Sequence, residues 1–286
     1  MATFRICLFT GLALIAFAAN SVLCRLALGE PSIDAASFSS IRIVSGAIVL
    51  WLILSATTRS RPPLTGSWKA AIALCLYAVP FSFAYIGLDA GVGALILFGT
   101  VQVTMMSAAL GMGERPNIIQ WTGLVLAAGG LVYLVMPGLS APPVFSSALM
   151  IAAGVGWGIY TLLGKGGRNP LANTASNFIR AIPLVVAVSL MAISQFQLSL
   201  QGALLAVVSG AVTSGIGYAI WYVALRDLTA TRAAIVQLSV PILAALGGAV
   251  VLSETITGRL VIATVVVLGG VGVGLAGREK TGKLSE

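Results

Sequence analysis

Long apolar stretches follow one another along almost the whole chain, and short segments with Pro, Gly or charged residues separate them. An α-helix needs about 20 apolar residues to cross the hydrocarbon core of a bilayer. The stretches therefore predict an all-α polytopic membrane protein with ten transmembrane helices. We expect these helices at residues 6–27, 36–57, 70–88, 91–112, 118–136, 145–164, 173–193, 201–223, 232–252 and 258–276.

Composition excludes several other classes of protein. Of the 286 residues, 58% are hydrophobic and 8% are charged, whereas a soluble domain has roughly 25% charged residues. The basic residues behind the net charge of +8 stand singly or in small groups between apolar stretches, so we expect no nucleic-acid partner. The chain has no His, and its three Cys lack metal-site spacing. We therefore expect no metal, no cofactor and no catalytic residues.

The distribution of Lys and Arg predicts the orientation in the membrane. With a cytoplasmic N-terminus, 12 of the 16 basic residues fall on the inside, and only Arg25 and Arg259 fall outside. Because cytoplasmic loops carry the excess of positive charge, we expect both termini in the cytoplasm and the protein in the bacterial inner (plasma) membrane. Arg5 and Cys24 faintly resemble parts of a lipoprotein signal, but further spans follow, so we interpret 6–27 as the first span.

The two halves of the chain are related by an internal repeat. A shift of 140 places Gly113-Glu114 on Ser253-Glu254 and Gly129-Gly130 on Gly269-Gly270, and a shift of 138 pairs Arg42 with Arg180. The repeats are residues 1–138 and residues 139–286, the second including a short cytoplasmic tail. Since five helices per repeat is an odd number, the second repeat has inverted topology. Inverted repeats are typical of secondary transporters that work by alternating access around a central site.

These residues carry a resemblance over nearly the whole chain. The second half has Trp157-Gly158, Arg180, Ala224-Leu225, Pro241, Ser253-Glu254 and Gly269-Gly270, and the first half echoes them with Arg42, Gly87-Leu88, Gly113-Glu114-Arg115 and Gly129-Gly130. The pattern resembles the EamA-type branch of the drug/metabolite transporter superfamily. The first half departs from it, with Phe17 to Asn20 where Trp-Gly is usual and Val101 opposite Pro241. The resemblance implies a transporter in a family that includes exporters of amino acids and related metabolites.

Two arginines lie inside predicted helices. A charge in hydrocarbon costs at least ~2.5 kcal/mol, so Arg42 and Arg180 either bind a substrate carboxylate, face a vestibule, or are held by headgroups or helix carbonyls. All eight acidic residues lie in loops, at helix ends or in the tail. A cationic substrate would therefore meet no carboxylate in the middle of the membrane, and no side-chain proton relay is visible.

Other polar residues complete the predicted substrate site. Trp221 and Tyr222 lie near a helix end and could belong instead to the interfacial aromatic belt. Aromatic and amide groups suit a polar pocket near the midplane because each can stack or form hydrogen bonds there. Beside the two arginines, the candidates for substrate binding are Asn20, Tyr85, Gln102, Trp157, Tyr160, Tyr218, Trp221, Tyr222 and Gln237.

Four residues are candidates for structural or gating roles. Glu114 and Glu254 recur just before the fifth and tenth helices, where a carboxylate would cap the helix N-terminus or act in gating. Pro80 and Pro241 lie inside predicted helices, where proline bends the helix and supplies either a hinge or a static kink.

The sequence as a whole predicts an exporter of small polar metabolites, above all amino acids or related carboxylate-bearing solutes, and not an enzyme. We expect a small-molecule substrate, the lipid bilayer as a partner, and a monomer or a homodimer. Two alternatives stay open. One is a multidrug or quaternary-cation exporter, which would lack its expected carboxylate. The other is a membrane-integral lipid-modifying enzyme, for which the loops are short and poor in acids.

Overall fold

The computed structural model describes residues 2–29, 32–57, 65–113, 116–135, 143–165, 167–252 and 258–276. Within these ranges the chain is helical apart from turns and one isolated antiparallel bridge between Ile33 and Leu198. The first half contributes α1 (Ala2–Gly29), α2 (Ala35–Thr57), α3 (Trp68–Ala84), α4 (Ala90–Gly111) and α5 (Ile118–Val135). The second half contributes α6 (Val144–Gly164), α7 (Pro170–Met191), a short 3-10 turn η1 (Ile193–Gln195), α8 (Leu200–Val208), η2 (Ser209–Ile216), α9 (Gly217–Leu225), α10 (Ala230–Gln237), α11 (Val240–Val251) and α12 (Gly258–Ala276).

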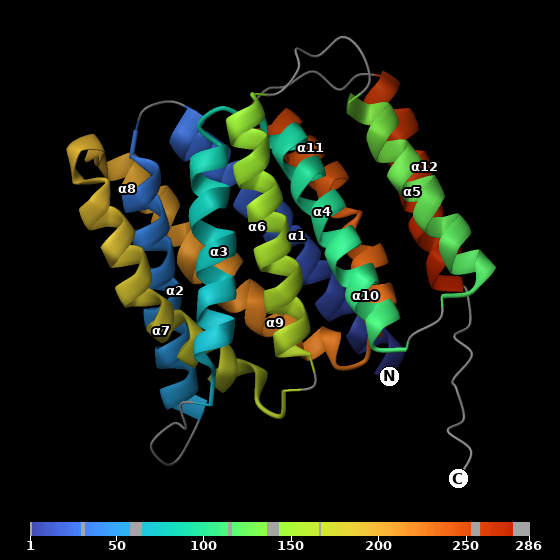
Figure 1. Ribbon diagram of the computed structural model, residues 1–286, viewed down its shortest axis with the longest axis horizontal. Coiled ribbons are helices and arrows are strands. Elements are labelled where there is room, and N and C mark those ends of the chain that lie inside the picture. Colours follow the sequence, from blue (N-terminus) through green and yellow to red (C-terminus); the bar gives the residue numbers. More distant parts are fainter. Residues whose placement is uncertain are drawn as a thin grey trace.

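The protein is a multi-pass membrane protein. Seven helical segments of the described chain are long and apolar enough to cross a bilayer, with α8, η2 and α9 forming one of them and α10 and α11 another. Three shorter apolar helices lie within α3, α5 and α12. Each α-helix overlaps one of the stretches expected from the sequence. The helices lie side by side in Figure 1.

Two of the expected helices are irregular. The stretch 201–223 contains the π-helical segment η2 at its centre, flanked by α8 and α9. The stretch 232–252 is interrupted at Leu238 and Ser239, between α10 and α11. Pro241 lies in the first turn of α11 and has no N–H for the preceding turn, which accounts for the interruption. By contrast, Pro80 lies inside α3, which continues through it.

The helices of the two halves pack on one another in a reciprocal pattern. α3 packs on α6, and α1 packs in the same way on the segment from α8 to α9. α4 packs on α6, and α11 packs on α1. α2 packs directly on α7, and α5 on α12. Each contact therefore recurs with the two halves exchanged. The start of α1 and the end of α12 lie at the same end of the bundle (Figure 1).

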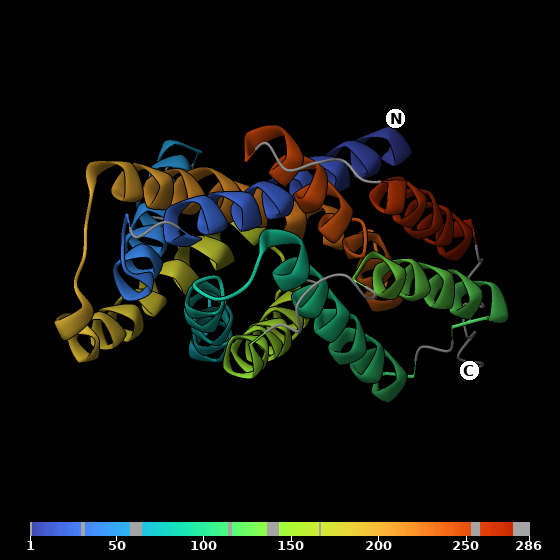
Figure 2. The ribbon, with the colours of Figure 1, turned by 90° about the horizontal axis from the view of Figure 1, so that it is seen from above.

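α5 and α12 form a pair at the edge of the molecule (Figure 2). Their backbones approach closely because glycines face each other: a Cβ on Gly123 would lie 2.5 Å from the Gly274 Cα and 2.6 Å from the Gly270 carbonyl oxygen. Gly270 and Gly274 of α12 thus pack against α5 of the same chain. Small residues at such contacts are the usual way in which membrane helices pack tightly.

The connection between α1 and α2 is tied to the connection before α8. The Ser199 amide donates to the Ser32 carbonyl at 2.8 Å, and the Asp34 amide donates to the Gln197 carbonyl at 2.9 Å. The Asp34 carboxylate also caps α2 by accepting from the Ser37 amide at 2.8 Å. These bonds close one end of the bundle between the two halves.

Candidate functional site

The guanidinium of Arg42 lies at the centre of the bundle and is fully buried. Its Nε donates to the Ser214 hydroxyl at 2.8 Å, and its Nη2 donates to the hydroxyls of Tyr77 at 2.8 Å and Tyr218 at 2.7 Å. The guanidinium carbon also lies 5.1 Å from the centre of the Phe81 ring, within the range of a cation–π contact. The Arg42 charge, carried by α2, is thus contacted by side chains from α3, η2 and α9.

Among the described residues, the partners of the Arg42 charge are neutral. The described carboxylates are those of Asp34, Asp89 and Asp227, and the ion pair found within the described chain joins Arg25 to Asp89, not Arg42. The Nη1 atom of Arg42 is buried and has no hydrogen-bond partner in the described part of the protein. Because buried charges are ordinarily paired, this guanidinium retains the capacity to bind an anion.

A second polar group extends the Arg42 network toward α1. The Asn20 Nδ2 donates to the Tyr77 hydroxyl at 3.1 Å, so Tyr77 joins the amide to the arginine. The Asn20 Oδ1 accepts from the hydroxyls of Ser209 at 2.6 Å and Thr213 at 3.2 Å. Both hydroxyls belong to η2, as does Ser214. The π-helical segment thus presents three hydroxyls to this network, and π-helical turns occur frequently at functional sites.

Aromatic rings surround these polar groups. The Trp157 ring lies 4.7 Å from that of Tyr218, 5.0 Å from that of Phe17 and 5.1 Å from that of Tyr77, measured between ring centres. The Trp157 Nε1 donates to the Gln237 Oε1 at 2.7 Å. Trp157 therefore links the cluster to the last residue of α10, directly before the helix interruption.

The space between these rings is closed in this structure. A cavity of about 10 Å³ lies beside the cluster, enough for about one water molecule. Its lining comes from α1, α3, α4 and α6, namely Phe17, Ser21, Tyr77, Phe81, Leu97, Phe98 and Trp157. Ligand pockets typically measure about 300–1,000 Å³, so a metabolite can enter only when these helices separate.

The structure brings together most of the residues that the sequence singles out. The ring centres of Tyr160 and Trp157 lie 5.9 Å apart, and the Tyr222 hydroxyl donates to the Tyr160 carbonyl at 2.8 Å. The ring centres of Trp221 and Phe17 lie 5.6 Å apart. Because Trp221 and Tyr222 are both buried inside the protein, they do not belong to an interfacial aromatic belt.

The other three candidates have different surroundings. The Tyr85 ring packs on that of Phe81, with 4.8 Å between ring centres, and the Tyr85 hydroxyl donates to the Ala90 carbonyl. Arg180 is only partly buried, and it donates to the carbonyl and hydroxyl of Ser176 in its own helix. Gln102 lines a separate crevice beside α5. The two arginines that match in the sequence are therefore not equivalent in their surroundings.

The predicted caps Glu114 and Glu254 lie outside the described residues. The cap of α5 within the described chain is reciprocal: the Gln120 amide donates to the Asn117 Oδ1 at 2.9 Å, and the Asn117 amide donates to the Gln120 Oε1 at 3.0 Å. The sequence carries the signature of this capping box, an Asn followed three residues later by Gln, and it is not among the predicted caps.

Sequence reasoning also missed Tyr77 and Phe81 on α3 and gave Ser214 little weight. A signal for them exists. The offset of 137 that matches Tyr85 to Tyr222 also matches Tyr77 to Ser214 and Phe81 to Tyr218. Arg42 contacts all four residues of these two pairs. The internal repeat thus marks the surroundings of Arg42 once the offset is applied to α3.

Polar contacts within each half also tie a helix end to a connection at an end of the bundle. The Arg25 Nη2 lies 3.1 Å from the Asp89 carboxylate, and its Nη1 donates to the Tyr85 carbonyl. At another connection, the Arg226 Nη2 donates to the carbonyls of Gly167 and Arg168. Both arginines tie the end of one helix to a turn between two others.

Comparisons with known proteins agree with this architecture. Residues 144–275 match the EamA-like transporter family. A protein of Pseudomonas aeruginosa described as uncharacterized is 50% identical over 274 residues, covering 96% of both chains. A probable amino-acid metabolite efflux pump of Salmonella typhimurium is 27% identical over 241 residues, covering 77% of this chain and 79% of that one.

A solved crystal structure shares the fold. It superposes with a TM-score of 0.72 at 19% identity and covers 94% of this chain and 98% of its own. An uncharacterized transporter of Bacillus subtilis, YoaV, is 21% identical over 82% of this chain and 85% of its own. With its apolar helices, its reciprocal packing and these relatives, the chain belongs to the EamA-like transporters of the drug/metabolite transporter superfamily.

Proposed function

We propose that the protein exports small carboxylate-bearing metabolites, amino acids among them, and that the substrate carboxylate binds the guanidinium of Arg42. The observation that carries this proposal is a fully buried charge with one nitrogen unpartnered and with neutral groups as its described partners. A carboxylate is the anion whose geometry best matches a guanidinium. Its binding would compensate a charge that is otherwise unpaired in a medium of low dielectric.

The surroundings of Arg42 suit the rest of an amino acid. The ring faces of Trp157, Tyr218 and Phe17 offer contact to an apolar side chain, and an aromatic face also attracts an ammonium group. The Asn20 amide lies on the same network, and the second N–H of its Nδ2 can donate to a substrate oxygen. The Salmonella relative named for amino-acid metabolite efflux supports this direction of transport and this substrate class.

Transport by this site would follow alternating access between two inverted repeats, residues 1–138 and 139–286. The reciprocal packing of the helices supports this division, since every major contact recurs with the halves exchanged. In this scheme the chain crosses the bacterial inner membrane ten times, with both termini in the cytoplasm. The closed cavity beside Trp157 then corresponds to an occluded conformation. The interruption at Leu238 and Ser239 and the π-helical η2 are the places where helices would bend.

The alternative functions fit the site less well. A quaternary cation would enter beside a buried positive charge, and the groups that contact this charge are rings and hydroxyls. A lipid-modifying enzyme would need acidic or His clusters, and no group of three or more His, Cys, Asp or Glu gathers among the described residues. The relatives are likewise named as transporters.

Flux into proteoliposomes tests the proposal. Purified protein is reconstituted and offered a mixture of amino acids, organic acids, nucleosides and quaternary amines, and the uptake is read by mass spectrometry. We expect saturable flux of the carboxylate-bearing solutes. Arg42→Gln should lower it sharply, whereas the matched variant Arg180→Gln should retain most of it. Selective flux of the quaternary amines, or equal loss in the two variants, would refute the proposed role of Arg42.

A further inference from the structure

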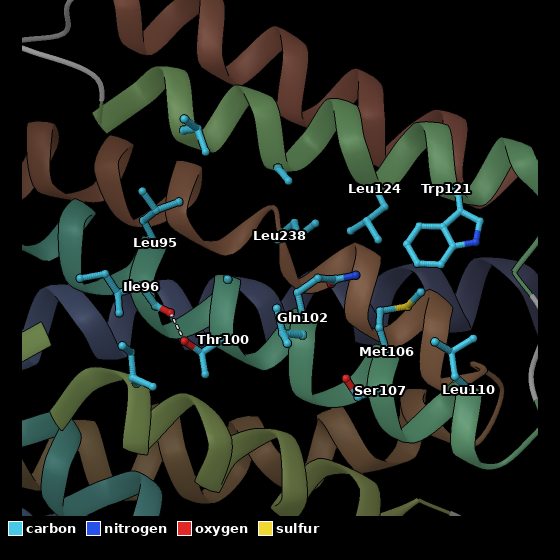
Figure 3. Close-up of a pocket in the computed structure, with 15 residues that line it drawn as sticks. Leu95, Ile96, Thr100, Gln102, Met106, Ser107, Leu110, Trp121, Leu124 and Leu238 are labelled. Carbon is cyan, nitrogen blue, oxygen red and sulfur yellow. Dashed lines mark hydrogen bonds between the residues drawn. The ribbon is translucent and has the colours of Figure 1, made fainter. Parts of the chain in front are cut away.

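A large crevice separates α4 from α5, and Arg42 is not among the residues that line it. Its volume is about 830 Å³, within the usual range for sites that hold small molecules. It is lined chiefly by α4 and α5, with Ile151 of α6 and Leu238 at the helix interruption (Figure 3). None of its lining residues belongs to the cavity beside Trp157. The crevice is therefore distinct from the proposed transport site.

The two walls of the crevice are only weakly joined. α5 packs extensively on α12 and barely touches α4, and Figure 3 shows Trp121 and Leu124 of α5 facing Met106 and Leu110 of α4 across the gap. Gly123 and Gly130, at which α5 closely contacts α12, do not line the crevice.

One polar side chain in this apolar lining has no partner. Gln102 is 6% exposed, and neither its Oε1 nor its Nε2 has a hydrogen-bond partner in the described part of the chain. Figure 3 shows its amide directed from α4 into the crevice. The nearby Thr100 hydroxyl is already bonded to the Ile96 carbonyl at 2.8 Å. An amide held away from water without a partner is unfavourable, so the crevice presents one donor and one acceptor to whatever fills it.

Lipid chains alone do not match this arrangement, because a hydrocarbon tail offers neither a donor nor an acceptor to Gln102. A charged ligand does not match it either, since the residues that line the crevice include no charged side chain. We propose that the crevice binds an uncharged, largely apolar molecule whose single amide or hydroxyl group pairs with Gln102. Such a molecule reaches the crevice from the bilayer and needs no opening of the Arg42 cluster.

Binding of radiolabelled decanamide to the full chain in lipid nanodiscs tests this proposal. Decanamide carries one amide on an apolar chain, and decane serves as the matched competitor without a polar group. We expect saturable binding that unlabelled decanamide displaces and decane does not. Gln102→Leu keeps the apolar volume and should weaken binding at least 10-fold.

Two further variants separate the crevice from the rest of the apolar surface. Ala128→Trp fills the crevice from α5 and should abolish saturable binding, whereas the control Ala187→Trp on the exposed face of α7 should leave it unchanged. Gln102→Leu should also leave the unliganded unfolding temperature equal or higher, because it removes an unpaired amide. Unsaturable partitioning, equal displacement by decane, or binding that Gln102→Leu and Ala128→Trp leave intact would overturn the proposal. None of these outcomes bears on flux through the Arg42 site.

Discussion

The Nη2 atom of Arg42 lies 2.7 Å from the hydroxyl oxygen of Tyr218, a residue 176 positions later in the chain. This bond joins α2 of the first half to α9 of the second half between two buried side chains. Since the same nitrogen also donates to Tyr77 of α3, a substrate that withdraws the guanidinium from these hydroxyls would loosen contacts between the halves. In the proposed transport cycle, Arg42 would thus couple substrate binding to the relative movement of the two halves.

Removing a hydroxyl partner should weaken this coupling. Tyr218→Phe keeps the ring that packs on Trp157 but leaves Arg42 with one hydrogen bond fewer. Hydrogen bonds to charged groups contribute about 1.5–3 kcal/mol, so we expect a clear fall in the unfolding temperature and a raised KM for carboxylate substrates. Thr122→Val, which removes a hydroxyl on the exposed face of α5, serves as the control. Unchanged values in Tyr218→Phe would contradict the network.

The bond between Trp157 and Gln237 permits a paired test. Gln237→Leu leaves the buried Trp157 Nε1 without its acceptor, which should lower stability by about 1–3 kcal/mol. Adding Trp157→Phe removes the orphaned donor. The double variant should therefore lose less than the sum of the two single variants, as measured by denaturant unfolding in detergent. Strict additivity would show that this bond contributes nothing to linking α6 with α10.

Gly210 allows the closest approach between α2 and η2. A Cβ at this position would collide with the Arg42 carbonyl oxygen and the Ser45 hydroxyl. Gly210→Ala should force the two helices apart, displace Arg42 and lower stability by about 1–3 kcal/mol, together with loss of transport. Gly129→Ala is the matched control because a Cβ there meets no atom within 4 Å. Equal stability and equal flux in Gly210→Ala and Gly129→Ala would contradict this prediction.

The Asp34 cap predicts a specific dependence of stability on pH. Burial raises the pKa of its carboxyl, but hydrogen bonds from the Ser37 and Gln197 amides lower it by more, so the pKa lies below the usual value of 3.8. A carboxyl with a lowered pKa stabilises the fold at pH values above its unfolded pKa, and this contribution is lost as the pH falls through the folded pKa. We expect the unfolding temperature to drop on acidification toward about pH 3. Asp34→Asn should flatten that drop, and an identical pH profile would exclude Asp34 as its source.

The helices and part of the central network could be predicted from the sequence. Apolar length alone placed α1, α2, α4 and α6, because spanning a bilayer demands a fixed number of apolar residues. Polar residues in such stretches are expensive, which singled out Arg42, Asn20 and Gln237. All three lie on the central network or beside it.

The sequence could not predict which face of its helix each polar residue occupies. Gln102 and Gln237 look alike in their apolar stretches, yet one faces the crevice beside α5 and the other accepts from Trp157. Arg42 and Arg180 also match, but only Arg42 is buried among hydroxyls. Stretches that are apolar all round carry no periodicity from which the inward face could be read. The sequence likewise has no pattern that distinguishes the π-helical segment η2 from an ordinary α-helix.

The most direct test of the central claim compares an exported amino acid with its carboxamide, which differs by the loss of the negative charge. Counterflow in proteoliposomes gives the apparent affinity for each compound. We expect the unaltered protein and Arg180→Gln to prefer the amino acid by more than about 10-fold, since a charge-assisted pair exceeds a neutral hydrogen bond by over 1.4 kcal/mol. Arg42→Gln should lose that preference, and Arg42→Lys should retain part of it. Undiminished preference for the carboxylate in Arg42→Gln, in a variant that folds and transports, would contradict the account.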